Sequence, residues 1–330
     1  MGVRNRRVQR NRGRRSPQQT MDVYFYEAFE EEVEALRKRL PSRLQAGFTG
    51  KTIQEQGDGE PPARLISIRT QSVLPKGWDA KLSGIVSRTT GYDHLVGRQI
   101  PCGYLPLYCS RAVAEQAILL MMALLRRLPM QMAQFPRFHR DGLTGRECDG
   151  KNLLVVGVGN IGSEVARIGQ GLSMHVRGVD ILQKHPFVSH VSLEEGLPWA
   201  DVIVCAMNLT AENAGYFRYE TLQRAKRGAL FINVARGEFS PLADLARLLD
   251  EEHLGGVALD VYENESRLSV ALRSGQTPKE LSGLLDRPNV IFTPHNAFNT
   301  AEAVERKAEQ TVQQIEYFLE HGKFLWPVPG

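Results

Sequence analysis

The sequence predicts an α/β protein whose main feature is a doubly wound parallel sheet. From residue 152 onward, short apolar runs rich in β-branched residues alternate with segments of helical spacing. Strands that alternate with helices are typical of parallel sheets with helices on both faces. The first of these runs leads into a glycine-containing loop, 157–162, that opens a helix. A chain of 330 residues with 42% hydrophobic and 24% charged residues is also long and apolar enough for two domains or one large one.

Before residue 152, the residue spacing predicts three strands, two helices and one loop. The first helix ends before Pro41, and the second is so apolar that we expect it in the core or at a subunit interface. The predicted strands are 23–25, 64–68 and 82–87, the helices are 27–40 and 113–128, and the loop 88–94 follows the third strand.

After residue 152, the alternation of strands and helices is regular, and the chain ends in a long amphipathic helix. No internal repeat is present. The predicted strands are 153–156, 176–179, 202–206, 229–234, 256–261 and 290–292, and the predicted helices are 218–225, 242–249, 279–285 and 301–321, besides the one that opens at the glycine loop.

The first twenty residues differ from the rest of the chain. They contain seven arginines and no acidic residue, and removing these charges from the net charge of +4 leaves the remainder at −3. With almost no apolar residues this segment cannot join a core, so we predict that residues 1–20 are a disordered basic extension. An RNA-binding arm, a transit peptide and a stretch upstream of a true start at Met21 are all open. The mildly acidic remainder argues against a nucleic-acid partner.

Cysteine content and hydropathy limit the class of protein further. The four cysteines form no CxxC pair and are too few for a disulfide scaffold. We therefore expect reduced thiols, a cytoplasmic location and no metal site. The longest apolar run, 117–125, has nine residues, whereas a membrane span needs about twenty. We therefore expect a soluble protein.

The loop GVGNIG at 157–162 matches the pattern GxGxxG between a strand and a helix. Gly157 permits a tight turn, Gly159 lets the backbone approach a pyrophosphate, and Gly162 allows close packing of helix and strand. The N-terminus of the helix then offers N–H groups to the phosphates. The loop therefore predicts a dinucleotide site, and the alternative is a purely structural turn.

Asp180 ends the next predicted strand, eighteen residues after the last glycine of the loop. Its carboxylate would accept hydrogen bonds from ribose hydroxyls and would repel a 2′-phosphate, which favours NAD over NADP. Lys184 and His185 lie close enough in the sequence to leave NADP open.

Polar side chains follow the last three predicted strands of this sheet. Arg236 follows one strand, Asp260 and Glu265 end or follow the next, and His295 follows the last. Because ligands bind beyond the carboxyl ends of strands in open α/β sheets, we expect these groups near a ligand. A histidine there can protonate a carbonyl oxygen, a carboxylate can hold the histidine tautomer, and an arginine can bind a substrate carboxylate. The alternatives are a loop-capping histidine, a surface arginine and a solvated glutamate.

These motifs occur together in one known family. They are AVAEQA at 112–117, VVGVGNIGSEVARI at 155–168 with Asp180, NVARGE around Arg236, ALDVYENE at 258–265 and TPHNAF at 293–298. On these residues, the sequence from Met21 to the C-terminus resembles the D-isomer-specific 2-hydroxyacid dehydrogenases. Ser266 stands where the family often has proline, and the segment before TPHNAF is long. Both features are most similar to the D-lactate dehydrogenase-like branch.

The resemblance implies an architecture and a reaction. It implies a Rossmann-type NAD-binding domain, residues 116–298, inserted into a flavodoxin-like α/β substrate domain, residues 21–115 and 299–330. The implied activity is NAD-dependent interconversion of a 2-keto acid and a D-2-hydroxy acid by a homodimer. An NAD(H)-sensing, non-catalytic scaffold of the same fold is the alternative, and a nucleic-acid-binding protein that uses the basic tail is a more distant one.

The resemblance also implies roles for individual residues. His295 would be the acid/base, Glu265 its partner, and Arg236 the group that binds the substrate carboxylate. The other implied substrate-binding residues are Thr90, Gly91, Tyr108 and Phe298, and the implied cofactor-binding residues are Gly157, Gly159, Asn160, Ile161, Gly162, Asp180, Ala235 and Asp260. Tyr108 and Phe298 could equally be core aromatics. If they line the site, they favour a substrate with a short or aromatic side chain, such as pyruvate or phenylpyruvate.

Overall fold

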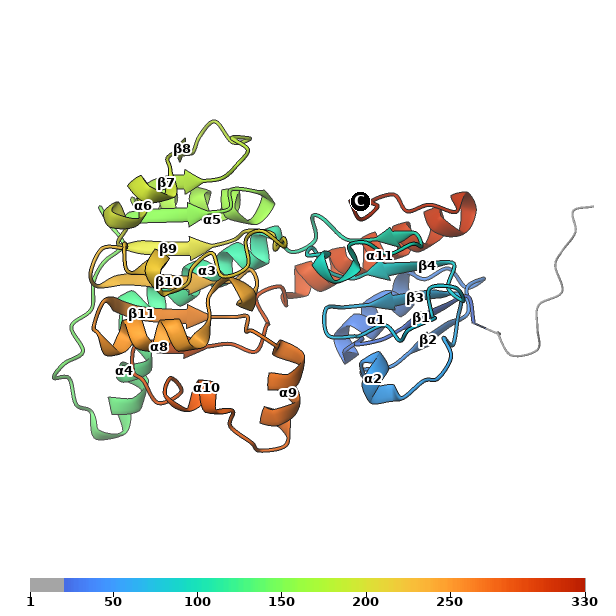
Figure 1. Ribbon diagram of the computed structural model, residues 1–330, viewed down its shortest axis with the longest axis horizontal. Coiled ribbons are helices and arrows are strands. Elements are labelled where there is room, and N and C mark those ends of the chain that lie inside the picture. The colour runs from blue at the N-terminus through green and yellow to red at the C-terminus, as the bar shows by residue number, and fades with distance from the viewer. Residues whose placement is uncertain (1–20, 330) are drawn as a thin grey trace, which may run out of the picture.

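The computed structural model describes residues 21–329, so the predictions for the basic extension lie outside the described part of the chain. Two α/β lobes stand side by side, each built on its own sheet (Figure 1). The smaller sheet has the strand order β2-β1-β3-β4-β5, and the larger has the order β12-β11-β10-β9-β6-β7-β8. All strand pairings are parallel. These are the flavodoxin-like and Rossmann-type strand orders, which confirms the predicted fold class.

The five-stranded lobe is made from both ends of the described chain. Its last helix, α11, returns from the C-terminal end and packs on α1 through a shared apolar cluster that includes Leu36, Ala308 and Ile315. The strands are β1 (Val23–Phe25), β2 (Ala46–Phe48), β3 (Leu65–Ile68), β4 (Gly84–Ser87) and β5 (Cys102–Gly103), and the helices are α1 (Glu30–Arg39), α2 (Ile53–Gln56) and α11 (Ala301–His321). The seven-stranded lobe is therefore an insertion between these parts.

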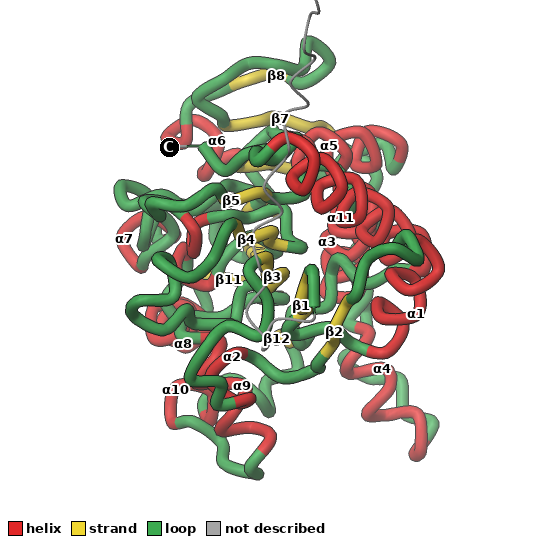
Figure 2. Tube along the Cα trace, turned by 90° about the vertical axis from the view of Figure 1, so that its right-hand side faces the viewer, coloured by secondary structure: helices red, strands yellow, loops and turns green. Residues whose placement is uncertain are grey.

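The seven-stranded lobe has helices on both faces of its sheet. Figure 2 shows α3 and α5 on one side and α7 and α8 on the other, and each side has its own apolar cluster. The strands are β6 (Asn152–Val156), β7 (His175–Val179), β8 (Ser189–His190), β9 (Val202–Cys205), β10 (Ala229–Asn233), β11 (Leu254–Leu259) and β12 (Val290–Phe292). The helices are α3 (Ser110–Leu125), α4 (Leu128–Gln134), α5 (Asn160–Gly171), α6 (Leu193–Trp199), α7 (Tyr219–Leu222), α8 (Leu242–Asp250), α9 (Glu265–Arg273) and α10 (Lys279–Ser282). Short 3₁₀ turns are η1 (Asp93–Leu95), η2 (Phe135–Arg137) and η3 (Gly237–Phe239).

Several predicted helices have different bounds. Those predicted over 218–225 and 279–285 are shorter, Tyr219–Leu222 and Lys279–Ser282, and two others differ for identifiable backbone reasons. The helix predicted from residue 27 begins at Glu30, because Glu27 has a positive φ of 54° and its carboxylate accepts backbone N–H groups from the segment after β3. The helix predicted over 113–128 runs from Ser110 to Leu125. It stops because Arg127 has a φ of 52°, a left-handed conformation that a helix cannot include, and α4 begins after it.

Two further differences concern the site region. The sequence did not predict α9, whose residues ESRLSVALR begin with Glu265. Strand β11 ends at Leu259, so Asp260 follows this strand rather than lying within it. The predicted domain boundary at 115/116 falls inside the continuous helix α3, and that boundary stays a prediction. Among the described residues, no helix is both long and apolar enough to cross a membrane.

Candidate active site

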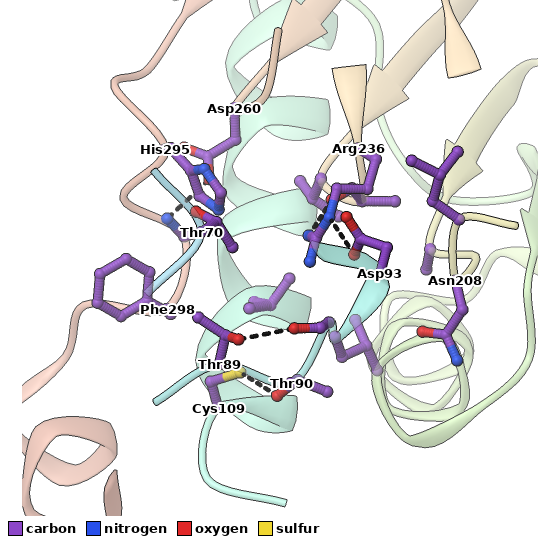
Figure 3. Close-up of a pocket in the computed structure, with 18 of the residues that line it drawn as sticks. Thr70, Thr89, Thr90, Asp93, Cys109, Asn208, Arg236, Asp260, His295 and Phe298 are labelled. Atoms are coloured by element: carbon purple, nitrogen blue, oxygen red, sulfur yellow. Dashed lines mark hydrogen bonds and ion pairs between the residues drawn. The ribbon is translucent and has the colours of Figure 1, made fainter. Parts of the chain in front are cut away.

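A cavity between the two lobes brings together loops from the carboxyl ends of both sheets (Figure 3). The five-stranded lobe supplies the segments around Arg69 and Thr90, and the seven-stranded lobe supplies the segments around Met207, Arg236 and His295. We call this the interlobe cavity. Its lining also includes Thr70, Thr89, Gly91, Tyr92, Asp93, Tyr108, Cys109, Val113, Ile161, Ala206, Asn208, Leu209, Val234, Ala235, Asp260, Ala297 and Phe298.

His295 and Glu265 form a close pair at one wall of the cavity. The Nδ1 atom of His295 lies 2.7 Å and 2.8 Å from the two carboxylate oxygens of Glu265. Because Nδ1–H donates to this carboxylate, the other ring nitrogen, Nε2, is left for a reactant. Burial favours the neutral acid, but the hydrogen bond and the charge of His295 outweigh it and lower the pKa of Glu265. The glutamate therefore stays ionised beside the imidazole.

The backbone at His295 adopts an unusual conformation, with a φ of 50°. Such left-handed backbone is costly for a non-glycine residue and persists where surrounding contacts hold it. Asp260 supplies these contacts, since its carboxylate accepts hydrogen bonds from Thr293 Oγ1 at 2.5 Å and from the N–H groups of Asn296 and Ala297 at 2.9 Å. Burial raises the pKa of Asp260 despite these bonds. Asp260 thus fixes the loop that presents His295.

Arg236 lies across the cavity from His295, directly after β10 (Figure 3). Its Nε donates to Asp93 at 3.0 Å, and its Nη1 donates to the carbonyl of Ala235 at 2.8 Å. The remaining edge of the guanidinium lies against Gly91, where an added Cβ would be only 1.6 Å from Nη2. Only glycine at position 91 therefore allows this arginine position.

Hydrogen bonds from the hydroxyl groups of two threonines hold the loop after β4. Thr89 Oγ1 donates to the carbonyl of Gly91 at 2.6 Å, and Thr90 Oγ1 donates to the carbonyl of Leu105 at 3.1 Å. Thr90 also contacts the thiol of Cys109 at 3.2 Å, and burial raises the pKa of that thiol. The backbone of this loop is thus fixed next to Arg236.

Two aromatic side chains form part of the wall. Tyr108 and Phe298 line the interlobe cavity, and both are nearly buried. The Phe298 ring lies 6.4 Å from the His295 ring. They therefore line the cavity and also pack with the core of the seven-stranded lobe, and their role in substrate binding stays a prediction.

The glycine loop has the geometry that a dinucleotide requires. Gly157 has a φ of 90°, and an added Cβ on Gly162 would lie 1.9 Å from the carbonyl oxygen of Gly157, so neither position accepts a side chain. A Cβ on Gly159 would meet nothing within 4 Å, so this backbone is open to a ligand. Asn160 and Ile161 begin α5, whose first N–H groups lack intrahelical partners and can bind phosphate. These residues fit a pyrophosphate.

Asp180 lies at the end of β7, next to the glycine loop. Its carboxylate accepts hydrogen bonds from the N–H groups of Val158 at 2.6 Å and Leu182 at 2.9 Å. An acidic group at this position suits the ribose hydroxyls of NAD and disfavours a 2′-phosphate. Ala235 and Ile161 line the cavity between this loop and His295, which suits the nicotinamide end of the same cofactor.

Several lining residues were not among the predicted site residues. Arg69 and Thr70 follow β3, and Asp93 and Cys109 come from the loops near Arg236. A signal for the first two was present, because they come directly after a predicted strand.

Comparisons with known proteins agree with this architecture. Residues 118–297, more than half of the chain, match the family model "D-isomer specific 2-hydroxyacid dehydrogenase, NAD binding domain". The chain is 29% identical over 294 residues to a Lactiplantibacillus plantarum D-lactate dehydrogenase, with 85% of each chain covered. It is 30% identical over 257 residues to D-lactate dehydrogenase kk1H of Curvularia clavata, with 74% of each chain covered.

A solved structure extends the similarity to both lobes. The D-lactate dehydrogenase of Aquifex aeolicus, crystallised with NAD and lactic acid, superposes with a TM-score of 0.81 at 27% identity. The match covers 94% of this chain and 100% of that one. The chain therefore belongs to the NAD-dependent D-isomer specific 2-hydroxyacid dehydrogenase family.

Proposed function

We propose that the protein interconverts a small 2-keto acid and the corresponding D-2-hydroxy acid, with His295 as the acid/base. The observation that supports this proposal most directly is the His295–Glu265 pair. The carboxylate occupies Nδ1 at 2.7 Å, while the ring itself lines the interlobe cavity. A histidine held in this way has one nitrogen free to exchange a proton with a substrate oxygen.

In the reductive direction, the chain's residues bind, orient and protonate the keto acid. Arg236 and the backbone N–H groups around Thr90 and Gly91 hold its carboxylate and turn the carbonyl toward His295. NADH, when bound, supplies a hydride to the carbonyl carbon. The protonated His295 donates the Nε2 proton to the carbonyl oxygen, and Glu265 stabilises the positive imidazole before transfer. In the oxidative direction, neutral His295 accepts the hydroxyl proton.

The side chains that line the cavity favour a keto acid whose substituent is limited in size or shape. Tyr108 and Phe298 line the cavity that contains His295, and their rings favour a short or flat group, as in pyruvate or phenylpyruvate. D-Lactate dehydrogenases among the relatives agree with a short substituent. The relatives named here are dehydrogenases, which favours catalysis over an NAD(H)-sensing scaffold.

The test is NADH oxidation, followed by its absorbance, with glyoxylate, pyruvate, hydroxypyruvate, 2-ketobutyrate, oxaloacetate and phenylpyruvate as separate substrates. We expect turnover with at least one of them, and oxidation of the D but not the L form of the matching hydroxy acid. The variant His295→Asn should bind NADH normally and lose turnover. NADH binding without any turnover would support the scaffold instead.

We further propose that the protein is a homodimer. Large apolar side chains are exposed along α3 and the segment that follows it, with Leu119 56%, Met132 68%, Phe135 74% and Phe138 74% exposed. Large exposed apolar side chains, when they gather on one face, are typical of a protein interface. Light scattering at micromolar concentration should give twice the chain mass, and a monomer would contradict the proposal.

The cysteines support a reducing, cytoplasmic location. All four are free thiols, and three of them, Cys102, Cys109 and Cys205, are buried. Oxidising compartments favour paired cysteines. A fluorescent fusion of the full chain should therefore distribute through the cytoplasm, and enrichment in an organelle would contradict this.

A further inference from the structure

Arg69 is a cation in the wall of the interlobe cavity that the proposed reaction does not use. It follows β3 directly, and it also lines a second cavity that shares His295 and Phe298 with the first. Within residues 21–329, its side chain makes no hydrogen bond or ion pair, and its Nε is buried without a partner. Its guanidinium lies over the Phe298 ring at 4.4 Å and near the Phe29 ring at 5.8 Å.

The charges behind this wall are mainly positive. Glu32 Oε1 accepts from Arg88 Nε at 2.9 Å and lies 3.0 Å from Lys307 Nζ, and all three side chains are fully buried. Burial opposes ionisation of Glu32, yet Arg88, Lys307 and Arg69 together lower its pKa to about 2. Burial also lowers the pKa of Lys307, to about 7, so this carboxylate faces two arginines and a lysine that is only partly protonated at neutral pH. Arg69 is the one of the three that also lines the cavity.

A second nearby carboxylate, that of Glu27, already accepts three hydrogen bonds from the backbone. Glu27 accepts the backbone N–H groups of Arg69 at 3.0 Å, Gln71 at 3.0 Å and Ser72 at 3.1 Å. These bonds hold the carboxylate against the backbone after β3 rather than against the guanidinium. A partly buried arginine without an anionic partner is costly, and an anion entering the cavity would relieve that cost.

Arg69 is also at a useful distance from the reacting centre. The Phe298 ring is near both groups, 4.4 Å from the Arg69 guanidinium carbon and 6.4 Å from the His295 ring. A reactant whose 1-carboxylate is held by Arg236 and whose carbonyl faces His295 would direct its side chain toward this ring. A keto acid of four or five carbons can place a terminal group there.

We propose that Arg69 binds a second carboxylate on the substrate, so that the protein acts preferentially on 2-keto dicarboxylic acids. This inference rests on the proposed function and specifies its substrate class. The planar guanidinium matches a carboxylate with two parallel hydrogen bonds. A site built around such a contact discriminates strongly against an analogue that lacks the charged group, because the cation is then left unpaired. The aromatic walls limit the length of the substrate, and Arg69 specifies its charge.

The test compares two four-carbon keto acids that differ mainly in the second carboxylate, oxaloacetate and 2-ketobutyrate. We expect the wild type to show the higher kcat/KM for oxaloacetate. Arg69→Gln should lower that value about tenfold to a hundredfold and change the value for 2-ketobutyrate by less than about threefold. The kcat/KM of Arg69→Lys for oxaloacetate should lie between those of the wild type and Arg69→Gln, because lysine keeps the positive charge but cannot make two parallel hydrogen bonds to a carboxylate. Arg64→Gln, an exposed arginine just before β3, is the matched control.

A binding measurement separates this proposal from the proposed function. The NADH-loaded protein is titrated calorimetrically with D-malate and with D-2-hydroxybutyrate, neither of which reacts with NADH. Tighter binding of D-malate that is lost in Arg69→Gln supports the Arg69 site. Equal losses for both ligands, or no preference in the wild type, overturn it, and so does a clear preference for a phosphorylated keto acid over oxaloacetate. Absence of all turnover contradicts the proposed function, and the D-malate titration then decides the Arg69 site alone.

Discussion

Replacing Glu265 with glutamine removes one charge next to His295 and keeps the shape of the side chain. The pair is close, at 2.7 Å, and both side chains are about one-fifth exposed, 21% and 19%. A hydrogen bond that involves a charged group contributes about 1.5–3 kcal/mol, which corresponds to roughly a ten- to 150-fold change in a rate or an equilibrium. In Glu265→Gln the hydrogen bond to His295 loses its charged acceptor. We therefore expect kcat/KM for keto-acid reduction to fall about tenfold to a hundredfold near neutral pH.

The assay follows NADH oxidation from about pH 6 to about pH 9, where the lowered pKa of Glu265 keeps its carboxylate ionised. The deficit of Glu265→Gln should be present throughout this range, because the variant lacks the charged acceptor at every pH in it. His295→Asn should lose about 10²–10⁴ in kcat/KM at every pH. NADH affinity, measured by fluorescence, should change by less than about twofold in both variants.

Glu263→Gln is the matched control, because Glu263 precedes α9 in the same loop and bonds to the N–H of Leu242 instead of to His295. It should behave as the wild type at every pH. An equal deficit in Glu263→Gln would mean that the loss comes from a disturbed loop and not from the His295–Glu265 pair. No deficit at all would mean that the pair has no role in proton transfer.

Other substitutions test further parts of the site. Gly91→Ala places a Cβ 1.6 Å from Arg236 Nη2. It should raise KM for the keto acid about tenfold or more and leave NADH affinity unchanged. The control Gly59→Ala, whose Cβ would meet nothing within 4 Å, should change neither KM nor NADH affinity. Asp180→Asn removes a charge that repels a 2′-phosphate, so the ratio of kcat/KM for NADPH to that for NADH should rise about tenfold or more. The pKa of Glu32 is about 2 in the folded protein, against an ordinary value of 4.5, so ionised Glu32 stabilises the fold above pH 4.5. About 3 kcal/mol of unfolding free energy should be lost as the pH falls from 4.5 to 2 in urea titrations, and Glu32→Gln should lack this loss.

The parts of the site that lie at strand ends could be predicted from the sequence. Parallel strands place their carboxyl ends at one edge, so Arg236 and His295 were expected together, and both line the interlobe cavity. The glycine loop was predictable for a similar reason, since its backbone conformation depends on residues that are adjacent in the chain. Local sequence is sufficient wherever the geometry follows from one strand and the turn after it.

Other features depend on contacts between distant segments. The prediction that Asp260 binds the cofactor stays a prediction, whereas its hydrogen bonds to residues 293–297, more than thirty positions further along the chain, were not foreseen. Arg69 becomes part of the site only because the five-stranded lobe docks against the seven-stranded one. The helix α9 was missed because its apolar spacing is weak, with Leu268 as its one buried residue. Such contacts leave no periodic signal in a single sequence.

The ionised state of Glu265 depends on both lobes. Within its own lobe, Glu265 begins α9, and the N-terminus of a helix favours a negative charge. From the other lobe, Gln71 Nε2 donates to Glu265 Oε1 at 3.2 Å, and this bond also lowers the pKa of the glutamate. An ion pair between Arg273 and Glu55, 3.2 Å apart, joins the lobes beside it. Because Gln71 comes from the segment that also contains Arg69, contact between the lobes adds a hydrogen bond to the His295–Glu265 pair. The same contact between the lobes places Arg69 in the wall of the interlobe cavity.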